Sequence, residues 1–343
     1  MLNYLKTLDR RIIYLFVLVG VILPIVGGFL FPVQSSPMTD SVVKALKELE
    51  PGSVILVSAD FDPGSQAELQ PMLLALLKYC FENEINVVSM GLWPMGPTLI
   101  DNAMDSDKVR ISKDRAEQLM LEGRKVYIIP KGEAGTEQYL EERDGKIVVV
   151  KETEREEVGD LFDDAIYYVK GIRSLFPEGH IKYGENYLAA GYQVGAGVVI
   201  LDLVASVPGA LKTDALNSKP VESYPIMNGI DTLKDIDMVF TLSSGSGGIK
   251  EWVIYGNGRS GVKVCGGVTA VSAPEFLPYL VSRQLAGMLA GLAGAAEFEA
   301  ATGYEMGEGI RGMTPQSFAH IIIILFIIIG NLVFLVEKYS ENK

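Results

Sequence analysis

The chain has 343 residues, of which 48% are hydrophobic and 21% charged, and its formal net charge is −13. The high apolar content excludes a disordered chain, and only two cysteines in a chain of this length exclude a small disulfide-stabilised fold. The negative charge argues against a nucleic-acid-binding surface, because such surfaces attract phosphate through Lys and Arg. We therefore expect no nucleic-acid partner.

The charges are unevenly distributed along the chain. Residues 12–33 and 318–336 carry no charge. Between these two runs lie 25 of the 30 Lys and Arg residues and 40 of the 43 Asp and Glu residues, so the middle of the chain has a net charge of about −15. This pattern predicts an acidic globular domain attached to a lipid bilayer.

The first uncharged run, 12–33, is long enough to cross the ~30 Å hydrocarbon core as a helix. It contains Pro24, Gly27 and Gly28, which helices in lipid tolerate. A cleaved signal peptide is the alternative, but the run is longer than a signal-peptide core and no good cleavage site follows it. The sequence therefore predicts an uncleaved transmembrane helix.

The second run, 318–336, is also long enough to span. Three Lys or Arg residues precede the first run and two follow the second, whereas fewer lie on the inner flanks. Since Lys and Arg concentrate on the cytoplasmic side, we expect both termini in the cytoplasm and the acidic domain outside. This arrangement is a two-pass protein of the cell membrane.

Between the runs, apolar β-branched segments alternate with amphipathic ones, which predicts strands and helices in alternation. In the first half we expect strands at 53–60, 85–90, 125–130 and 146–152, and helices at 67–84, 113–124 and 158–176. In the second half we expect strands within 194–206 and at 237–244 and 262–271, and helices at 249–258 and 273–301.

Such alternation is typical of an α/β fold with a mostly parallel, doubly wound sheet. The halves have a similar element order, so they form either one large sheet or two similar lobes; two lobes would resemble the type I periplasmic-binding architecture in fold alone.

Residues 188–211 contain one charge and are a possible third span, but their glycines and β-branched residues fit a buried strand better. The predicted segments are a cytoplasmic tail (1–11), a transmembrane helix (12–33), a linker with a short helix (34–52), two α/β lobes (53–176 and 177–301), a linker (302–317), a transmembrane helix (318–336) and a cytoplasmic tail (337–343).

The first candidate binding loop follows the strand at 53–60. Ligands of doubly wound sheets bind beyond the carboxyl ends of strands, so Asp60, Asp62 and Ser65 are predicted ligand-binding residues. Their carboxylates suit a cation or a cationic ligand. Ser65 and Glu68 also have the spacing of a capping box, which explains these two without a ligand.

The second candidate loop, between the strand at 237–244 and the next helix, contains Ser243, Ser244, Ser246 and Gly247. Free backbone N–H groups before a helix can bind an anion such as carboxylate or phosphate. The loop lacks the Lys of a P-loop, and a simple strand-to-helix turn is the alternative.

Other motifs give little sign of catalysis. The pattern G-x-G-x-x-G occurs at 256–261 and 307–312, but neither copy lies between a strand and a helix, as dinucleotide binding requires. His180 has no obvious catalytic partners, and Cys80 and Cys265 resemble buried small apolar residues that could pair outside the cytoplasm. We expect no catalytic residues, no metal site and no cofactor.

Small residues recur with helical spacing in the helix predicted at 273–301, and such a stripe lets another backbone approach closely. Tight packing inside the domain is the alternative to a subunit interface. The candidate interface residues are Ala286, Gly287, Ala290, Gly291, Gly294 and Ala295.

Three functions follow from these patterns. The first is a non-enzymatic, oligomeric scaffold or subunit of a membrane complex, with copies of itself or other membrane proteins as partners. The second is a ligand-binding or sensing module, with transport as one possible context. The third is a metal-dependent hydrolase that uses Asp60 and Asp62.

Overall fold

The computed structural model describes residues 10–27, 30–129, 138–143, 146–151, 154–158, 165–245 and 247–341. The chain divides into two compact units. We call Met1–Val33 with Ile310–Lys343 the helical unit, and Gln34–Gly309 the α/β unit.

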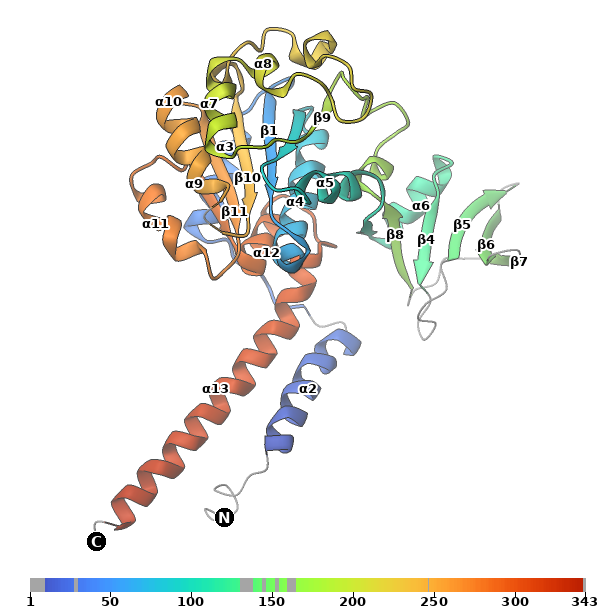
Figure 1. Ribbon diagram of the computed structural model, residues 1–343. Helices are drawn as coiled ribbons and strands as arrows, with labels where there is room; N and C mark the ends of the chain where they lie inside the picture. Colours follow the sequence, from blue (N-terminus) through green and yellow to red (C-terminus); the bar gives the residue numbers. More distant parts are fainter. Residues whose placement is uncertain are drawn as a thin grey trace. The chain divides into compact units, whose positions relative to one another are not determined.

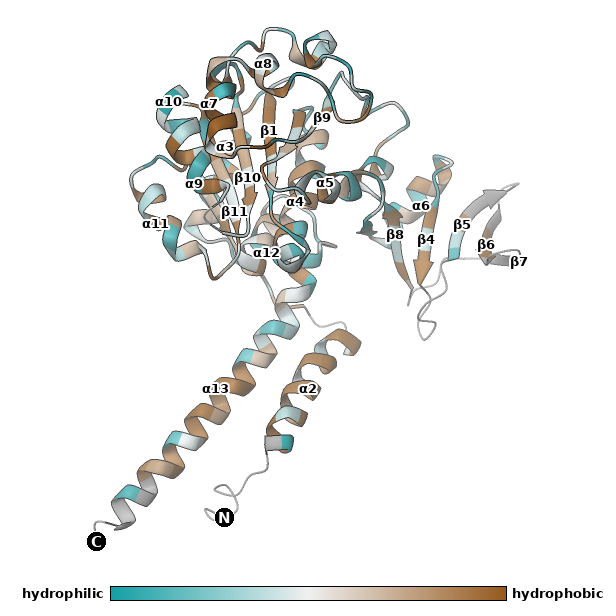
Figure 2. Ribbon diagram, in the orientation of Figure 1, coloured by the Kyte–Doolittle hydropathy of each residue, from teal (hydrophilic) through white to brown (hydrophobic). Residues whose placement is uncertain are grey.

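The helical unit is built from α2 (Arg10–Gly27) and most of α13 (Glu308–Glu341). Within the described residues, one helix is long and apolar enough to cross a membrane, at Glu308–Leu335. Figure 2 shows the apolar residues along α13. This helix contains the expected second span at 318–336. The first expected span, 12–33, corresponds to α2, which is apolar but shorter than the length required of a membrane-spanning helix.

The two helices of this unit pack along each other in antiparallel directions (Figure 1). The rings of Phe16 and Phe326 lie 5.8 Å apart, and those of Phe31 and Phe318 stack at 5.3 Å, so positions later in α2 and its extension meet earlier positions of α13. Gly20 lies directly against the side chain of Ile322. A glycine at this position allows the two helix backbones to approach closely.

The α/β unit contains a parallel sheet, sheet A, in the order β12-β11-β10-β1-β2-β9. Its strands are β1 (Val54–Asp60), β2 (Asn86–Gly91), β9 (Tyr187–Tyr192), β10 (Met238–Ser243), β11 (Lys263–Val268) and β12 (Gly287–Ala290). Strands of both expected lobes therefore lie in one sheet, with β1 and β10 side by side.

Helices cover both faces of sheet A (Figure 1). One apolar cluster contains side chains of α3, α4, α5 and α12, and the other contains side chains of α7, α8, η6 and α11. Alternate residues of β1 point to opposite clusters, Ile55 and Val57 to the first and Leu56 to the second, as the two-residue period of a strand requires. The sheet is thus buried on both faces, which explains its nearly continuous apolar strands.

The helical segments of the α/β unit connect and flank these strands. They are α3 (Pro37–Lys47), η1 (Pro63–Ser65), α4 (Gln66–Glu82), α5 (Gly96–Asp105), α6 (Lys113–Leu121), η2 (Ile172–Leu175), α7 (Gly197–Ala205), α8 (Val207–Leu211), η3 (Val221–Ser223), η4 (Pro225–Met227), η5 (Leu233–Asp235), α9 (Ile249–Glu251), the π-helix η6 (Trp252–Asn257), α10 (Gly258–Ser260), α11 (Ala273–Val281) and α12 (Gly291–Ala301).

A second, antiparallel sheet, sheet B, has the order β3-β8-β4-β5-β6-β7. Its strands are β3 (Lys108–Ile111), β4 (Val126–Ile129), β5 (Gln138–Arg143), β6 (Lys146–Lys151), β7 (Glu154–Val158) and β8 (Ile166–Lys170). The strands expected at 125–130 and 146–152 therefore exist but belong to this antiparallel sheet, so the parallel sheet is only part of the fold.

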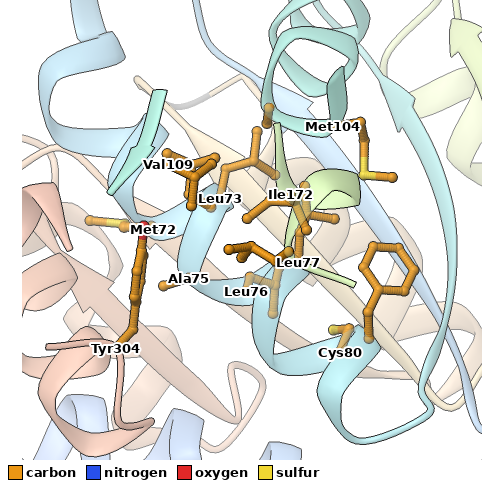
Figure 3. Packing of buried hydrophobic residues seen from close by; sticks show 14 of the residues in the cluster. Met72, Leu73, Ala75, Leu76, Leu77, Cys80, Met104, Val109, Ile172 and Tyr304 are labelled. Atoms are coloured by element: carbon orange, nitrogen blue, oxygen red, sulfur yellow. The ribbon is translucent and has the colours of Figure 1, made fainter. Parts of the chain in front are cut away.

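The apolar cluster around α4 joins the two sheets. Figure 3 shows the α4 side chains of Met72, Leu73 and Leu77 together with Val109 of β3 and Ile172 of η2. All of them are fully buried. Sheet B and sheet A thus share one core through this helix.

Three expected elements differ in the structure. The segment 158–176 contains β8 and η2, because Ile166–Lys170 pairs with both β3 and β4; residues 159–164 lie outside the described residues. The segment 194–206 forms α7, which buries Val199, Ile200 and Leu203 at helical spacing. The β-branched residues that suggested a strand are compatible with a helix packed on a sheet.

The expected helix at 273–301 is also broken. It forms α11, then β12, then α12. β12 pairs in parallel with β11, and these hydrogen bonds outweigh the helix preference of Ala and Leu. Gly291 follows β12 with φ +60°, a conformation that favours glycine.

Candidate functional site

The two loops singled out in the sequence lie at the same edge of sheet A. β1 and β10 are parallel neighbours, and Asp60 is directly opposite Ser243 at their carboxyl ends. From β1 the chain continues to β2 on one side, and from β10 it continues to β11 on the other. Ligands of doubly wound sheets bind at such a divergence point. If only the six strands of sheet A are numbered in chain order, their order across the sheet is the same as in dinucleotide-binding sheets. This is a similarity of fold and gives no evidence of function.

Asp60 is fully buried at this point. Its Oδ1 accepts hydrogen bonds of 2.8 Å from the hydroxyl of Ser58 and from the backbone N–H of Leu92. Its Oδ2 accepts a hydrogen bond of 2.8 Å from the hydroxyl of Thr241. Three strands or their loops thus converge on one carboxyl group.

Burial raises the pKa of Asp60 to about 6, because the interior disfavours the charged form. The hydrogen bonds from Leu92, Ser58 and Thr241 oppose this shift. The indole N–H of Trp252, which is also fully buried, lies near the same carboxyl and lowers its pKa, but makes no hydrogen bond of normal geometry among the described residues. The result is a buried acid poised near neutral pH.

A chain of hydroxyl groups connects this acid to the second loop. The backbone N–H of Ile249 donates to Oγ of Ser243 at 2.8 Å, and Ser243 Oγ lies 3.0 Å from Oγ1 of Thr241. The hydroxyl of Thr241 donates its hydrogen bond to Asp60. Thr241 Oγ1 therefore accepts the hydrogen bond from the hydroxyl of Ser243. The start of α9 is therefore linked through two hydroxyls to the carboxyl group.

Gly248 fits this arrangement because it has no side chain. Its φ is +129°, and a Cβ there would lie 2.7 Å from Cβ of Asp60. Its N–H donates to the carboxylate of Glu251 at 2.7 Å. The N–H groups of Gly248 and Ile249, which the sequence suggested for an anion, are thus occupied by side chains of the protein itself.

Hydrogen bonds tie the neighbouring loops together. Trp93, after β2, donates from Nε1 to the carbonyl of Gly247 at 3.1 Å. Ser272, after β11, donates to the carbonyl of Ser244 at 3.3 Å. The loops that follow β2, β10 and β11 therefore form one connected surface at this edge.

The expected capping box is wrong. Ser65 precedes α4 but caps no backbone N–H, and Glu68 accepts a hydrogen bond of 2.8 Å from the backbone N–H of Ala270 in the loop after β11. Asp62 caps the short η1 turn by accepting from the N–H of Gly64 at 2.9 Å. Among the described residues, the hydroxyls of Ser65 and Ser244 make no hydrogen bond, so both remain available.

Of the predicted ligand-binding residues, the structure brings Asp60 and Ser243 into one network and places Asp62, Ser65, Ser244 and Gly247 in the loops beside it. Ser246 lies outside the described residues. Sequence reasoning missed Ser58, Thr241 and Trp252. For Ser58 and Thr241 the sequence did contain a signal. Each lies two residues before a predicted site residue, Asp60 or Ser243, in an otherwise apolar strand, and residues two apart in a strand point to the same face of the sheet.

The candidate interface residues do not form a stripe on one helix, because Gly287–Ala290 is a strand and Gly291 begins α12. A Cβ on Gly287 would lie 2.5 Å from the backbone nitrogen of Val42 in α3, and one on Gly294 would crowd Leu289. These small residues thus serve close packing within the α/β unit.

The second G-x-G-x-x-G motif surrounds a buried acid. Glu299 of α12 is fully buried and accepts a hydrogen bond of 3.0 Å from the N–H of Gly309. A side chain on Gly307 would collide with the Glu299 carboxylate. These glycines are required for packing, and dinucleotide binding has no support here.

Both cysteines are buried free thiols, Cys80 in α4 and Cys265 in β11. Burial raises the pKa of Cys265 to about 12, with a smaller opposing effect of Lys263, so this thiol is unreactive near neutral pH. Within the described ranges, no group of three or more His, Cys, Asp or Glu side chains is placed to hold a metal ion.

A cavity of about 260 Å³ lies elsewhere, between α4, the end of β3, the start of α6 and the loop after α12. Two of its cations are already paired. Lys78 contacts Glu82 at 2.6 Å, and Arg110 contacts Glu308 at 2.7 Å. The edge at Asp60 and Ser243 is therefore the stronger candidate site.

Comparison with known protein families, with curated proteins and with solved structures gives no match.

Proposed function

We propose that this chain is a two-pass membrane protein whose α/β unit, outside the cytoplasm, binds a small polar ligand at the edge of sheet A between β1 and β10. The anchoring part rests on α13 and on the antiparallel contacts of Gly20 and Phe16 with Ile322 and Phe326. Two membrane spans whose termini lie on the same side of the bilayer must run in opposite directions, as α2 and α13 do. The Lys and Arg bias at the chain ends supports a cytoplasmic location for the termini.

The observation that carries the binding proposal is the opposition of Asp60 and Ser243 at the divergence point of sheet A. Ligand sites occur at such points because loops from neighbouring strands separate there. A buried acid with a pKa near 6 and connected hydroxyls lies directly beneath these loops. Perturbed acids of this kind cluster at functional sites.

The kind of ligand follows from which hydrogen-bonding groups of these loops are already bonded within the protein and which are not. The N–H groups of Gly248 and Ile249 already donate within the protein, whereas Asp62, Ser65 and Ser244 offer acceptor oxygens. An anion would also meet the acidic side chains of this edge. We therefore propose a donor-rich ligand, an amine or a polyol.

A thermal-shift experiment on the full chain in detergent tests this proposal. Spermidine and glucose are the amine and polyol probes, and inorganic phosphate is the anionic comparison. We expect spermidine or glucose to raise the unfolding temperature, since a ligand that binds only the folded state stabilises it. Ser244→Leu should remove the shift, and Ser282→Leu, on the exposed end of α11, should retain it. Stabilisation by phosphate alone would contradict the proposal.

An oligomeric scaffold is the second candidate function. It is supported by exposed apolar side chains on and beside α7 and η6, where Val194 is 76% exposed, Val198 64% and Ile254 40%. Clusters of this kind are typical of interaction surfaces. Light scattering of the detergent-solubilised chain tests it: an oligomer that Val198→Asp converts to a monomer supports a scaffold, and a monomer before substitution contradicts it.

The metal-dependent hydrolase is not proposed. Both oxygens of Asp60 accept hydrogen bonds from protein donors, and Asp62 caps η1. These contacts occupy both oxygens of Asp60 and one oxygen of Asp62, and among the described residues no group of three or more His, Cys, Asp or Glu side chains is placed to hold a metal ion.

A further inference from the structure

The solvent-facing side of α11 is apolar. Val281 is 84% exposed and Leu277 42%, and Val271, in the loop just before the helix, is 88% exposed. Pro274 and Pro278 are exposed as well. Because positions three and four apart share one side of a helix, these residues form a stripe along α11. We call it the α11 stripe, and it consists of Val271, Pro274, Leu277, Pro278 and Val281.

The opposite side of α11 holds the helix in this orientation. Phe276 is fully buried and Ala273 is buried, and both belong to the apolar cluster that contains Val264 of β11 and Met288 of β12. Turning the stripe inward would bring the ring of Phe276 into water, which is unfavourable. The stripe is therefore a fixed part of the surface of the α/β unit.

The α11 stripe carries no charge. Glu275 is the one charged residue of α11, and it pairs with Lys250 of α9 at 3.5 Å. Contiguous apolar surface of this kind is unfavourable in water, and it marks a contact with another protein or with a membrane.

The first connection between the α/β unit and the helical unit lies near the stripe. Ala270 lies against Gly291, the first residue of α12, since a Cβ on Gly291 would be 2.6 Å from Cβ of Ala270. Glu297 is about 9 Å further along α12, and it accepts two hydrogen bonds from Ser36. Ser36 in turn follows closely on Val33, where the helical unit ends.

The second connection leaves the α/β unit beside the same helix. A Cβ on Gly309 would lie 2.7 Å from the backbone nitrogen of Ala296 in α12. From there α13 continues without a break, and its uncharged run begins at Phe318, about 14 Å further along the helix. The headgroup layer of a bilayer takes up about 5–8 Å of that length. Both connections are therefore short and start next to the end of the sheet that carries the stripe.

We infer that the α11 stripe rests on the membrane surface, with its side chains at the boundary between headgroups and acyl chains. This inference rests on the membrane anchoring proposed above. Amphipathic helices bury an apolar face at that boundary. A protein partner is the poorer fit, because the residues that dominate protein interfaces are Trp, Tyr and Arg, whereas Leu and Val are under-represented among them. The stripe contains only Val, Leu and Pro.

The test uses the full chain in phosphatidylcholine nanodiscs, with a fluorophore attached to a single introduced cysteine. Cys80 and Cys265 are fully buried and should not react. Part of the lipid carries a nitroxide near the headgroup end of an acyl chain, where it quenches only fluorophores close to it. We expect strong quenching for Val271→Cys and for Val281→Cys.

Arg259→Cys is the matched control. Arg259 is exposed in α10, just before β11, whereas Val271 follows β11. The two labels thus lie at opposite ends of one strand, about 20 Å apart, and the label at position 259 should be quenched weakly or not at all. Quenching at positions 271 and 281 that is no stronger than at position 259 would overturn the inference.

A label in the expected span separates this inference from the anchoring on which it rests. Ile327 is exposed in α13, and a fluorophore on Ile327→Cys should be quenched by a nitroxide deep in the acyl chain. If it is quenched while the labels at positions 271 and 281 are not, the chain is anchored but the stripe does not touch lipid. If Ile327→Cys is not quenched either, the anchoring fails together with the inference.

Substitutions within the stripe add a second readout. Leu277→Asp with Val281→Asp should reduce quenching at position 271 about twofold or more, because a carboxylate resists transfer out of water. Leu121→Asp with Leu216→Asp adds the same charge at exposed apolar positions elsewhere on the α/β unit and should leave the quenching unchanged. Equal quenching in the two double variants would contradict a lipid contact of the stripe. Labels that lipid does not quench, in a chain that light scattering shows to be an oligomer, would assign the stripe to a second copy instead.

Discussion

Glu297 of α12 and Ser36, which lie 261 residues apart in the chain, are joined by two hydrogen bonds: Oε2 of Glu297 accepts from the Ser36 N–H at 3.0 Å and from its hydroxyl at 2.6 Å. The same oxygen accepts from the hydroxyl of Thr39 at 2.6 Å. Ser36 is also the N-cap of α3. One carboxylate thus fastens the first helix of the α/β unit to its last.

We expect Glu297→Ala to lower the free energy of unfolding by about 1–3 kcal/mol, because it leaves several donors of α3 without an acceptor. Chemical denaturation of the full chain in detergent measures this change. Glu275→Ala is the control, since its ion pair with Lys250 is exposed and 3.5 Å long, and should change the value by less than about 0.5 kcal/mol. Equal effects of the two substitutions would refute a fastening role for Glu297.

The buried acid predicts a specific pH dependence. The folded-state pKa of Asp60 is raised to about 6 from its ordinary 3.8, so the folded state holds this proton more tightly than the unfolded state does. Its contribution to stability is therefore largest at low pH and is lost as pH rises through about 6, by about 3 kcal/mol in total. Asp60→Asn, which keeps the shape and an acceptor, should remove this decline between pH 4 and pH 7. Parallel stability curves for both proteins would count against the raised pKa.

Two glycines of the loop after β10 make a matched pair. Gly248→Ala places a Cβ 2.7 Å from Cβ of Asp60 at φ +129°, and we expect it to lower the free energy of unfolding by about 1–3 kcal/mol. Gly245→Ala should be neutral within about 0.5 kcal/mol, because no other atom lies within 4 Å of its added Cβ. Thermal unfolding of both variants checks the difference, and a neutral Gly248→Ala would show that the loop is not held against Asp60.

A second glycine pair tests the helical unit. Cysteines introduced by Phe16→Cys and Phe326→Cys should be joined by a short bis-maleimide reagent in nanodiscs, since the rings they replace are in contact, and the native cysteines should not interfere because both are buried. Gly20→Leu should reduce this cross-linking severalfold, since the added side chain collides with Ile322. Gly330→Leu has open space around it and should not. Unchanged cross-linking in Gly20→Leu would exclude the close approach of α2 and α13.

Sequence patterns located the strands of sheet A well where burial is continuous. β1, β2, β10 and β11 lie within or beside the expected ranges, because a strand buried on both faces is an unbroken apolar run. Their order was not predictable, since β1 pairs with β10 through contacts that no local pattern encodes. Polar residues at strand ends did indicate the edge where Asp60 and Ser243 meet.

The failures share a physical cause. α7 and β12 both contain apolar residues that fit either a helix or a strand, and their state depends on the partner that each one packs against. The antiparallel order of sheet B depends on pairing with β8, a segment whose pattern, Ile166–Lys170, is too short to identify alone. Asp60 was visible as a polar residue, but its burial and its donors Ser58 and Thr241 required the assembled sheet.

The position of β1 in sheet A has a consequence for how the protein folds. One edge of this central strand pairs with β10, which begins only at Met238. During synthesis, β1 and β2 must therefore wait for most of the chain before the middle of the sheet closes, and long-range closure of this kind is slow. We expect the α/β unit to stay open until β10 has been synthesised, so the part of the chain that precedes Met238 cannot complete sheet A by itself.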